Sequence, residues 1–452
     1  MTTKTLARWG AAVIVSTALS TPTFAAMGNT ASTYGLLPAD VGTAMGLSMF
    51  NPQASALYYN PAYLTRDPRG ELTVGLLHGD QELRAVSQGN PSGGAPSVIR
   101  DGDILNDTLS QQQVIALKTD LTDMTKFEHP IYFAIIAGVE KFGEEMLAFD
   151  SSTSMEGQFF NYGRQPLFLN LGGGLELANG ITTGASAHIS LRSEATLIAS
   201  ANLAGETQRE ELTVSAKPVI RPVLSMNLEW DKVFCGKEDC GIWTGLETAF
   251  AFRGHTEART AVESNLTIPG TVIDPGITVL IDTIDSYQPD IFSAGLLYHF
   301  TDNFRAAVTV EQQNWSDLED ELARDTVKDQ AFAEFKDIVV PRIGGEFNIN
   351  DTYKLTGGVA FSESPLDSNA SLEVNYLDTD KWILGLGLTA QYKSVPVLAF
   401  PVRLDLAYQY QKLETRTFDL YDRRSPSFPQ PYESVDAEGD VHVFSGSITL
   451  KF

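Results

Sequence analysis

Polar and apolar residues alternate over long stretches of this chain, which is the pattern of a β-strand with one apolar face. Residues 382–392, WILGLGLTAQY, show it most clearly. The even-numbered residues from Trp382 to Tyr392 are all apolar, whereas Gly385, Gly387, Thr389 and Gln391 fall on the other face. Aromatic residues at both ends of an apolar face are typical of a lipid-facing strand, because Trp and Tyr favour the two membrane interfaces. A soluble β-sandwich would not need them there.

The alternation recurs along the chain and runs to its last residue, where SGSITLKF (445–452) resembles a strand that pairs to close a cylinder. Short links (FGEE, ANGI, TDN, NDTY) alternate with long ones (89–129, 263–286, 317–337, 420–437), as in outer-membrane barrels with short periplasmic turns. We therefore predict an all-β fold, a fourteen-stranded antiparallel transmembrane β-barrel in the cell outer membrane. The predicted strands are 70–88, 130–141, 146–160, 166–178, 181–199, 211–230, 241–262, 287–301, 303–316, 338–350, 352–364, 380–393, 400–419 and 438–452.

The segment 89–129 is the longest predicted loop. Within it, Val114, Leu117, Leu121 and Met124 recur at helical spacing, which predicts a short amphipathic helix. Such a helix could lie on the membrane surface, cap the lumen or pack on the rim of the barrel.

The N-terminus divides into two parts ahead of the barrel. Lys4 and Arg8, an apolar stretch and small residues up to Ala25 predict a signal peptide over 1–25. The next part, 26–68, is rich in Gly and Ala and ends with the turn Asn60-Pro61-Ala62. Because the lumen of a fourteen-stranded barrel is too wide for its own side chains to fill, we predict that 26–68 is a hatch and 69–452 the barrel.

Composition excludes some functions. The net charge of −25 argues against a nucleic-acid partner, since phosphates need Lys and Arg. Cys235 and Cys240, in CGKEDC, predict a small disulfide, and with no His nearby we expect no metal and no cofactor. No nucleotide-binding motif is present, so we expect any uptake to be passive and gated by the ligand.

Five segments stand out in order along the chain: the turn Asn60-Pro61-Ala62, YQPDIFSAGLLYHFTDNF, Asn314-Trp315-Ser316, FKDIVVPRIGGEFNINDTYKLTGGVAFSESPLDS and DTDKWILGLGLTAQY. Together they resemble the FadL-type outer-membrane transporters of long-chain fatty acids and other hydrophobic compounds (OMPP1/FadL/TodX). The resemblance covers essentially the whole mature chain. It implies a fourteen-stranded barrel with an N-terminal hatch, and a ligand that is caught by outer loops and leaves sideways at a kink in the third strand.

The resemblance also implies site residues. Lys336 and Arg192 match the cations at the ligand head group, although both could simply balance charges in the lumen. Asn60, Pro61 and Ala62 would belong to the gate. Gly157, Asn161 and Gly163 punctuate the predicted third strand and fit a kink. The expected partners are a long-chain fatty acid or another hydrophobic small molecule and the lipids of the outer membrane, with the protein a monomer.

Three alternatives remain open at this point. A neutral alkane or aromatic could replace the fatty acid. His188 and Ser190, two apart on one strand face, have a spacing that a barrel lipase could use, but the pattern turns them into the lumen, so we do not expect an enzyme. A general hydrophilic porin is the third alternative, and the predicted hatch argues against it.

Overall fold

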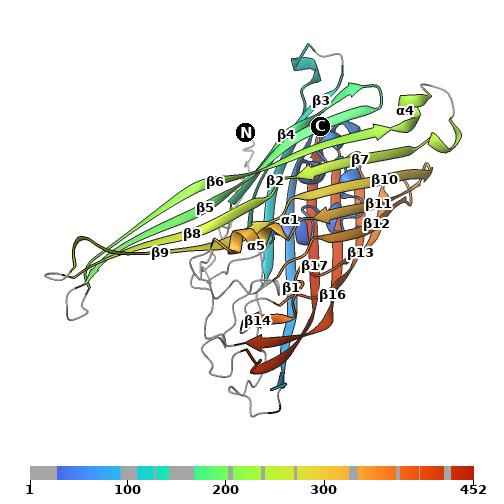
Figure 1. Cartoon of the computed structure of the whole chain (residues 1–452). Helices are drawn as coiled ribbons and strands as arrows, with labels where there is room; N and C mark the ends of the chain where they lie inside the picture. Colours follow the sequence, from blue (N-terminus) through green and yellow to red (C-terminus); the bar gives the residue numbers. More distant parts are fainter. Residues whose placement is uncertain are drawn as a thin grey trace, which may run out of the picture.

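The computed structural model describes residues 28–91, 93, 109–126, 129–141, 167–201, 207–235, 240–268, 272–324, 334–372, 377–396, 398–421 and 429–452. Fourteen strands in antiparallel order form a closed barrel in which β17 pairs with both β16 and β1, as Figure 1 shows. The predicted fold class is confirmed. The barrel strands are β1 (Glu71–Gly89), β2 (Ser110–Asp120), β3 (Ile131–Lys141), β4 (Leu167–Ala178), β5 (Ile181–Ala201), β6 (Thr207–Glu229), β7 (Leu246–Arg253), β10 (Ile291–Thr301), β11 (Phe304–Gln313), β12 (Ile338–Asn348), β13 (Tyr353–Ser362), β15 (Lys381–Tyr392), β16 (Val402–Tyr421) and β17 (Glu433–Lys451).

Exposure alternates along these strands as the sequence pattern predicts. On β15, Leu384 and Leu386 are 52% and 68% exposed, whereas Ile383, which precedes them, is buried. The outward face therefore carries an apolar belt that can contact lipid, and the inward face carries most of the polar and charged residues. Among the described residues, no helix combines the length and apolar character needed to cross a membrane.

The two ends of the barrel differ. The chain enters at Glu71 of β1 and leaves at Lys451 of β17, which are paired residues at one end. At that same end the connections between β4 and β5 and between β10 and β11 are two residues long, and β12 and β13 are joined by four. Outer-membrane barrels have their short turns and chain termini on the periplasmic side of the membrane. This end is therefore the periplasmic one.

The helix predicted around Val114 to Met124 is wrong in its main part. Residues 110–120 form β2, which pairs with β1 on one side and β3 on the other. Val114 faces inward and is buried, whereas Leu117 faces outward and is 39% exposed. A short apolar run is compatible with the period of a helix and with that of a strand. Here the run forms a strand because the two neighbouring strands satisfy its backbone N–H and C=O groups. Only Thr122–Met124 is helical, as the 3-10 turn η3.

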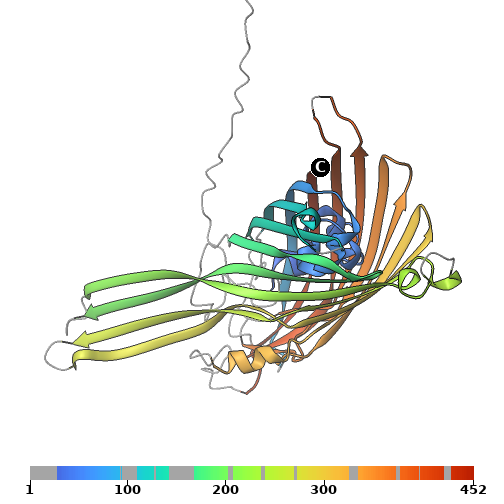
Figure 2. The same ribbon diagram turned by 90° about the horizontal axis from the view of Figure 1, so that it is seen from above.

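Two other strand predictions need correction or lie outside the described part. The predicted strand 146–160 lies outside the described residues, and β3 pairs directly with β4. The predicted strand 241–262 is divided between β7 and β8 (Thr256–Ile268), and the predicted loop 263–286 contains most of β9 (Val272–Gln288). β8 and β9 form a hairpin of their own and project from the barrel beside the long ends of β5 and β6 (Figures 1 and 2). A short strand β14 (Ala370–Leu372) pairs in parallel with β16, and α5 (Asp317–Leu322) follows β11.

Residues 28–66, here called the N-terminal segment, lie inside the ring of strands (Figure 2). They correspond to most of the predicted hatch, and their role in gating stays a prediction. Nearly all of their side chains are buried against the inner wall of the barrel. The elements are short: α1 (Thr30–Thr33), α2 (Pro38–Val41), η1 (Ser48–Phe50), α3 (Ala56–Tyr59) and η2 (Pro61–Arg66). The predicted signal peptide, 1–25, lies outside the described residues.

The closure between β1 and β17 can be tested by cross-linking. The hydroxyls of Thr73 and Thr449, a directly opposed pair, lie 2.9 Å apart in the lumen. We expect Thr73→Cys with Thr449→Cys to form a disulfide, because directly opposed Cα atoms in antiparallel strands lie about 4.5–5.5 Å apart, within the range that a disulfide spans. The cross-linked chain should migrate faster than the reduced chain after full heat denaturation in SDS gels. Thr73→Cys with Leu450→Cys is the control, since residue 450 faces outward and should not cross-link. Equal cross-linking in both variants would contradict the register.

Candidate ligand path through the plugged lumen

The turn Asn60-Pro61-Ala62 packs directly on a row of small residues in the wall. The Ala62 N–H donates to the Ser225 hydroxyl of β6 at 2.9 Å. A side chain on Gly184 of β5 would overlap the Pro61–Ala62 peptide, and one on Gly174 of β4 would overlap the Pro61 carbonyl. Gly174, Gly184 and Ser225 are paired in turn across the three strands. The backbone of the turn therefore approaches the backbone of the wall because no side chain separates them.

Asn60 also holds the turn to the rest of the N-terminal segment. Its side-chain amide donates to the Met49 carbonyl at 2.7 Å. The neighbouring Tyr59 hydroxyl donates to the Ala31 carbonyl at 2.6 Å. These two contacts connect η1 and α1 to the turn, so a displacement of the turn would reach the whole segment.

A second row of glycines holds the opposite side of the segment. Gly344, Gly358 and Gly385 are paired in turn across β12, β13 and β15. A Cβ on Gly385 would lie 2.6 Å from the Ala44 nitrogen. Ala44 and Met45 have φ angles of 48° and 61°, a left-handed conformation that side chains rarely adopt. Such conformations persist only when their surroundings hold them.

Asp40 organises this part of the segment. Its carboxylate accepts hydrogen bonds from the Leu37 N–H at 3.1 Å, the Ser48 hydroxyl at 2.8 Å and the Asn51 amide at 3.3 Å. The first of these caps α2 at its N-terminus. Burial is the largest influence on the carboxyl and raises its pKa from 3.8 to about 6, against the lowering effect of its hydrogen bonds.

Buried charges connect the wall to the segment. Glu311 of β11 pairs with Arg253 of β7 at 2.5 Å and with Arg342 of β12 at 3.2 Å. Arg342 also donates to the Ala44 carbonyl at 3.2 Å, and Arg253 lies over the Tyr58 ring at 5.4 Å. Because an unpaired buried charge is costly, removing Glu311 would leave both arginines without this carboxylate.

The lumen below the segment, toward the periplasm, is lined by charged and polar residues. It contains a cavity of about 160 Å³. Arg305 and Lys354 there both pair with Glu346, at 3.1 and 3.0 Å, and Lys451 pairs with Asp67 at 2.6 Å. This side of the plug is therefore unfavourable for an apolar molecule.

The lumen above the segment, toward the outside, contains a smaller pocket of about 70 Å³ between the start of the segment and the ends of β10 to β15. Its apolar walls include Ile291, Trp315, Ile338 and Ile383. Beyond it, apolar side chains from α5 and the outer loops pack on the upper inner faces of β1, β16 and β17. The charged residues that line the pocket itself are Arg342, Lys381, Glu363 and Asp378.

The predicted site residues are not all brought together. Lys336 precedes β12 at the outer end of the lumen, and its ammonium lies 3.8 Å from Glu363, which lines the upper pocket. The backbone of Arg192 lies in β5 opposite Lys217 of β6, but its side chain is outside the described part. Gly157, Asn161 and Gly163 also lie outside the described residues. The suggested role of Lys336 and Arg192 in carboxylate binding stays a prediction.

His188 packs among side chains of the wall and of the N-terminal segment. Its ring lies in the lumen between Tyr58 and Phe168, at 5.7 and 5.6 Å between centroids, and Nδ1 lies 2.5 Å from the Asn170 amide oxygen. Three neighbouring side chains therefore contact the imidazole. The position is typical of a residue that packs the N-terminal segment against β4 and β5.

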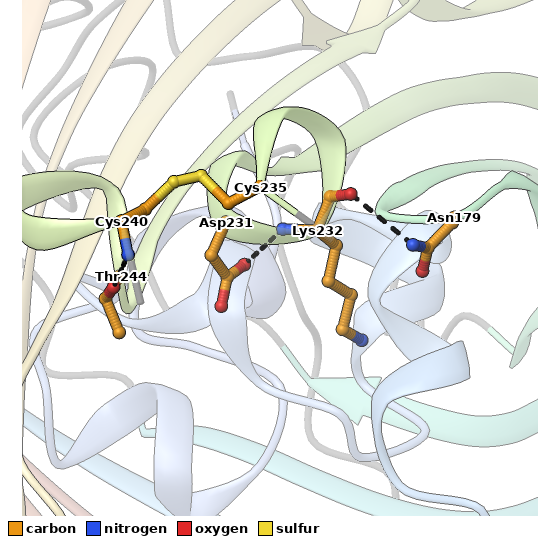
Figure 3. Close-up of a disulfide and its surroundings, with 6 residues drawn as sticks. All are labelled: Asn179, Asp231, Lys232, Cys235, Cys240 and Thr244. Carbon is orange, nitrogen blue, oxygen red and sulfur yellow. Dashed lines mark hydrogen bonds between the residues drawn. A yellow bond between two sulfur atoms is a disulfide. The ribbon is translucent and has the colours of Figure 1, made fainter. Parts of the chain in front are cut away.

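Cys235 and Cys240 form a disulfide in the periplasmic turn between β6 and β7, with their Cα atoms 6.0 Å apart (Figure 3). The turn contains α4 (Trp230–Phe234) and η4 (Gly241–Trp243). Asn179 from the adjacent turn donates to the Lys232 carbonyl at 3.4 Å. The pair is remote from the upper pocket.

Sequence reasoning missed Asp40, the Arg253–Glu311–Arg342 group and the two glycine rows. The glycines were visible as GGG at 172–174, GG at 344–345 and 357–358, and GLG at 385–387. They form rows only once strand pairing places them side by side. Asp40 follows a Pro-Ala start of a helix, where an acidic third residue indicates a cap.

Comparisons with known proteins agree with this architecture. A family model described as outer membrane protein transport protein (OMPP1/FadL/TodX) matches residues 247–452. Alkane uptake protein A of Marinobacter nauticus is 48% identical over 448 residues, or 98% of this chain and 95% of that protein. The crystal structure of a Pseudomonas aeruginosa FadL homologue matches with a TM-score of 0.60 and 14% identity, over 92% of this chain and 98% of that one. The toluene transporter TodX of P. putida matches with a TM-score of 0.53 and 13% identity, over 93% and 99%. At such identities the structural matches concern the fold alone.

Gly184→Ala should loosen the Asn60-Pro61-Ala62 turn. Overpacking costs about 1–3 kcal/mol, so amide exchange over residues 56–66 should accelerate roughly tenfold to a hundredfold. Gly345→Ala is the matched control, because its Cβ would have no neighbour closer than 3.6 Å. Both variants should keep the heat-modifiable mobility of a folded barrel. Unchanged exchange in Gly184→Ala would mean that the turn is not held by this row.

Asp40 should make the N-terminal segment sensitive to pH. A carboxyl whose pKa is raised on folding contributes stability that is present below pH 4 and is lost as the pH rises through about 6. Exchange over residues 37–55, corrected for intrinsic rates, should therefore be roughly tenfold slower at pH 5 than at pH 7. Asp40→Asn should abolish this difference. The same pH dependence in both proteins would exclude Asp40 as its source.

Proposed function

This chain belongs to the outer-membrane transport proteins of the OMPP1/FadL/TodX family, and from that premise we propose that it takes up neutral hydrocarbons across the outer membrane. It is an outer-membrane transporter of hydrophobic compounds. The proposal concerns the class of ligand and the route. Transport of this kind makes and breaks no covalent bond, so it needs no catalytic group.

The charge balance around the upper pocket carries the proposal. The charged residues that line the pocket are the cations Arg342 and Lys381 and the carboxylates Glu363 and Asp378. Two positive and two negative charges leave no net charge. A ligand carboxylate would have to compete with the carboxylates already present, and each displaced pair would cost free energy. A neutral, apolar ligand meets no such competition.

The sequence relationship points in the same direction. Alkane uptake protein A is similar to this chain over nearly its whole length. The apolar walls of the pocket are mainly aliphatic, with Ile291, Ile338 and Ile383 beside the single ring of Trp315. Aliphatic walls of this kind suit a saturated chain, because the gain from burying it scales with apolar area.

The N-terminal segment and the charges below it favour a sideways exit. An axial path would lead an apolar molecule into the polar cavity beside Arg305, Glu346 and Lys354. We therefore infer that the ligand leaves sideways through the wall into the membrane, down its concentration gradient and gated by the N-terminal segment.

A fatty acid is the second candidate, since one observation favours it. Lys336 is 44% exposed in its side chain and its contact with Glu363 is long, at 3.8 Å. Such a pair is weak in water and could exchange Glu363 for a ligand carboxylate. Arg192 would then have to supply a second cation.

Uptake of radiolabelled hexadecane and oleate by cells that express the protein distinguishes the candidates. We expect hexadecane uptake by the wild type, and no more than about a twofold change in Lys336→Ala, since a neutral ligand makes no charge-assisted contact. If Lys336 or Arg192 binds a carboxylate, Lys336→Ala and Arg192→Ala should lower oleate uptake roughly tenfold to a hundredfold. Glu363→Gln is the matched control, because it changes a charge at the same pocket without removing a cation. Wild-type cells that take up oleate but not hexadecane would overturn the proposal.

A further inference from the structure

The periplasmic turn between β6 and β7 exposes an unusual amount of apolar surface. Phe234 and Ile242 are 66% and 75% exposed, and Val233 and Trp243 are 37% and 39% exposed. A loop in water would be expected to turn polar residues outward, and contiguous exposed apolar residues indicate a contact surface.

Three aromatic rings give this surface a defined shape. The Trp230 ring stacks on Phe234 at 5.4 Å and lies 5.5 Å from Trp243, and Phe234 and Trp243 are 6.0 Å apart. Trp230 and Phe234 belong to α4, whereas Trp243 belongs to η4, on the other side of the disulfide. The Cys235–Cys240 bond, which Figure 3 shows, therefore joins the chain segments that carry the two halves of the cluster.

The cluster lies on the outer side of the barrel, not over the lumen. The Trp230 indole N–H donates to the Thr248 hydroxyl at 3.2 Å. Thr248 alternates along β7 with the inward residues Glu247 and Ala249, and shares its face with Phe250, which is 49% exposed. Trp230 is thus attached to the wall that carries the apolar belt.

A row of aromatic residues lies near the turn along the same periplasmic rim. Tyr298 of β10 is paired with Leu246 at the start of β7. Its ring lies 4.9 Å from Phe300, which lies 5.5 Å from Phe304 across the next turn. Aromatic residues with a polar edge gather at the level of lipid headgroups.

From these positions we propose that the disulfide-closed turn, in its described residues 230–235 and 240–243, is an anchor that inserts into the periplasmic leaflet of the outer membrane at headgroup level. Its partner is a phospholipid surface, with Phe234, Ile242 and Trp243 among the acyl chains. The disulfide keeps the two halves of the turn together, so little conformational entropy is lost on insertion.

The base of the anchor is connected to the N-terminal segment. Arg66, the last residue of η2, pairs with Glu229 at the end of β6 and with Glu247 of β7 at 2.9 Å. These two carboxylates flank the turn. Insertion of the turn would therefore also steady the wall on which the Asn60-Pro61-Ala62 turn is docked.

Depth-dependent fluorescence quenching tests the anchor. The full chain with Trp315→Phe and Trp382→Phe keeps Trp230 and Trp243 as the tryptophans after residue 25. It is reconstituted in vesicles of phosphatidylethanolamine and phosphatidylglycerol whose acyl chains are brominated either near the glycerol or near the methyl end. We expect bromine near the glycerol to lower the emission at least about twofold, and bromine near the methyl end to lower it less, because the rings lie at the interface. Aqueous iodide should quench weakly.

Substitutions in the anchor sharpen the test. Phe234→Ser with Ile242→Ser should weaken bromine quenching and strengthen iodide quenching while heat-modifiable mobility is kept. Met124→Ser is the matched control: Met124 is 82% exposed on the periplasmic turn between β2 and β3 but lies outside the ring cluster, so quenching should not change. Strong iodide quenching without bromine quenching in the unsubstituted turn would overturn the proposal and leave the cluster as a surface for a periplasmic protein.

Discussion

Hydrocarbon cannot satisfy a peptide hydrogen bond, and this constraint governs the whole molecule. A strand that crosses the membrane must find partners for its N–H and C=O groups on both sides, so the sheet has to close. Here closure joins β1 to β17 over nearly the full length of both strands. It also forces 110–120 into a strand despite its helical spacing, because β1 and β3 each need a neighbour.

Closure with fourteen strands creates a second requirement, since the lumen is too wide to be filled by wall side chains. The N-terminal segment fills it, and two rows of small residues allow its backbone to approach the wall directly. One row receives the Asn60-Pro61-Ala62 turn and the other receives Thr43 and Ala44. Charged residues that face inward are paired with each other or with the segment, as in the Arg253–Glu311–Arg342 group. The result is a plugged barrel whose upper pocket has several apolar walls and balanced charges and whose lower side is polar.

The difference in polarity between the two sides of the plug also determines how an apolar ligand meets the surrounding membrane. An apolar ligand held above the plug has a favourable environment beside it, in lipid, and an unfavourable one below it. On the periplasmic side, the aromatic rim and the disulfide-closed turn carry the apolar surface down to the level of the headgroups. Arg66 connects this rim to the end of the N-terminal segment. Wall, plug and membrane contact are therefore parts of one arrangement.

Much of this architecture is readable from the sequence. Alternation in WILGLGLTAQY determined which residues of β15 face lipid, and the aromatic ends marked the interfaces, because a strand has a period of two whatever surrounds it. The inward direction of His188 followed from the same period. Pairing between distant strands decided the rest. Whether 110–120 is a helix or a strand, that Gly174 and Gly184 lie side by side, and that Lys336 faces Glu363 all depend on residues far apart in sequence. Local propensity cannot specify such contacts, since they exist only when the barrel closes and brings those residues together.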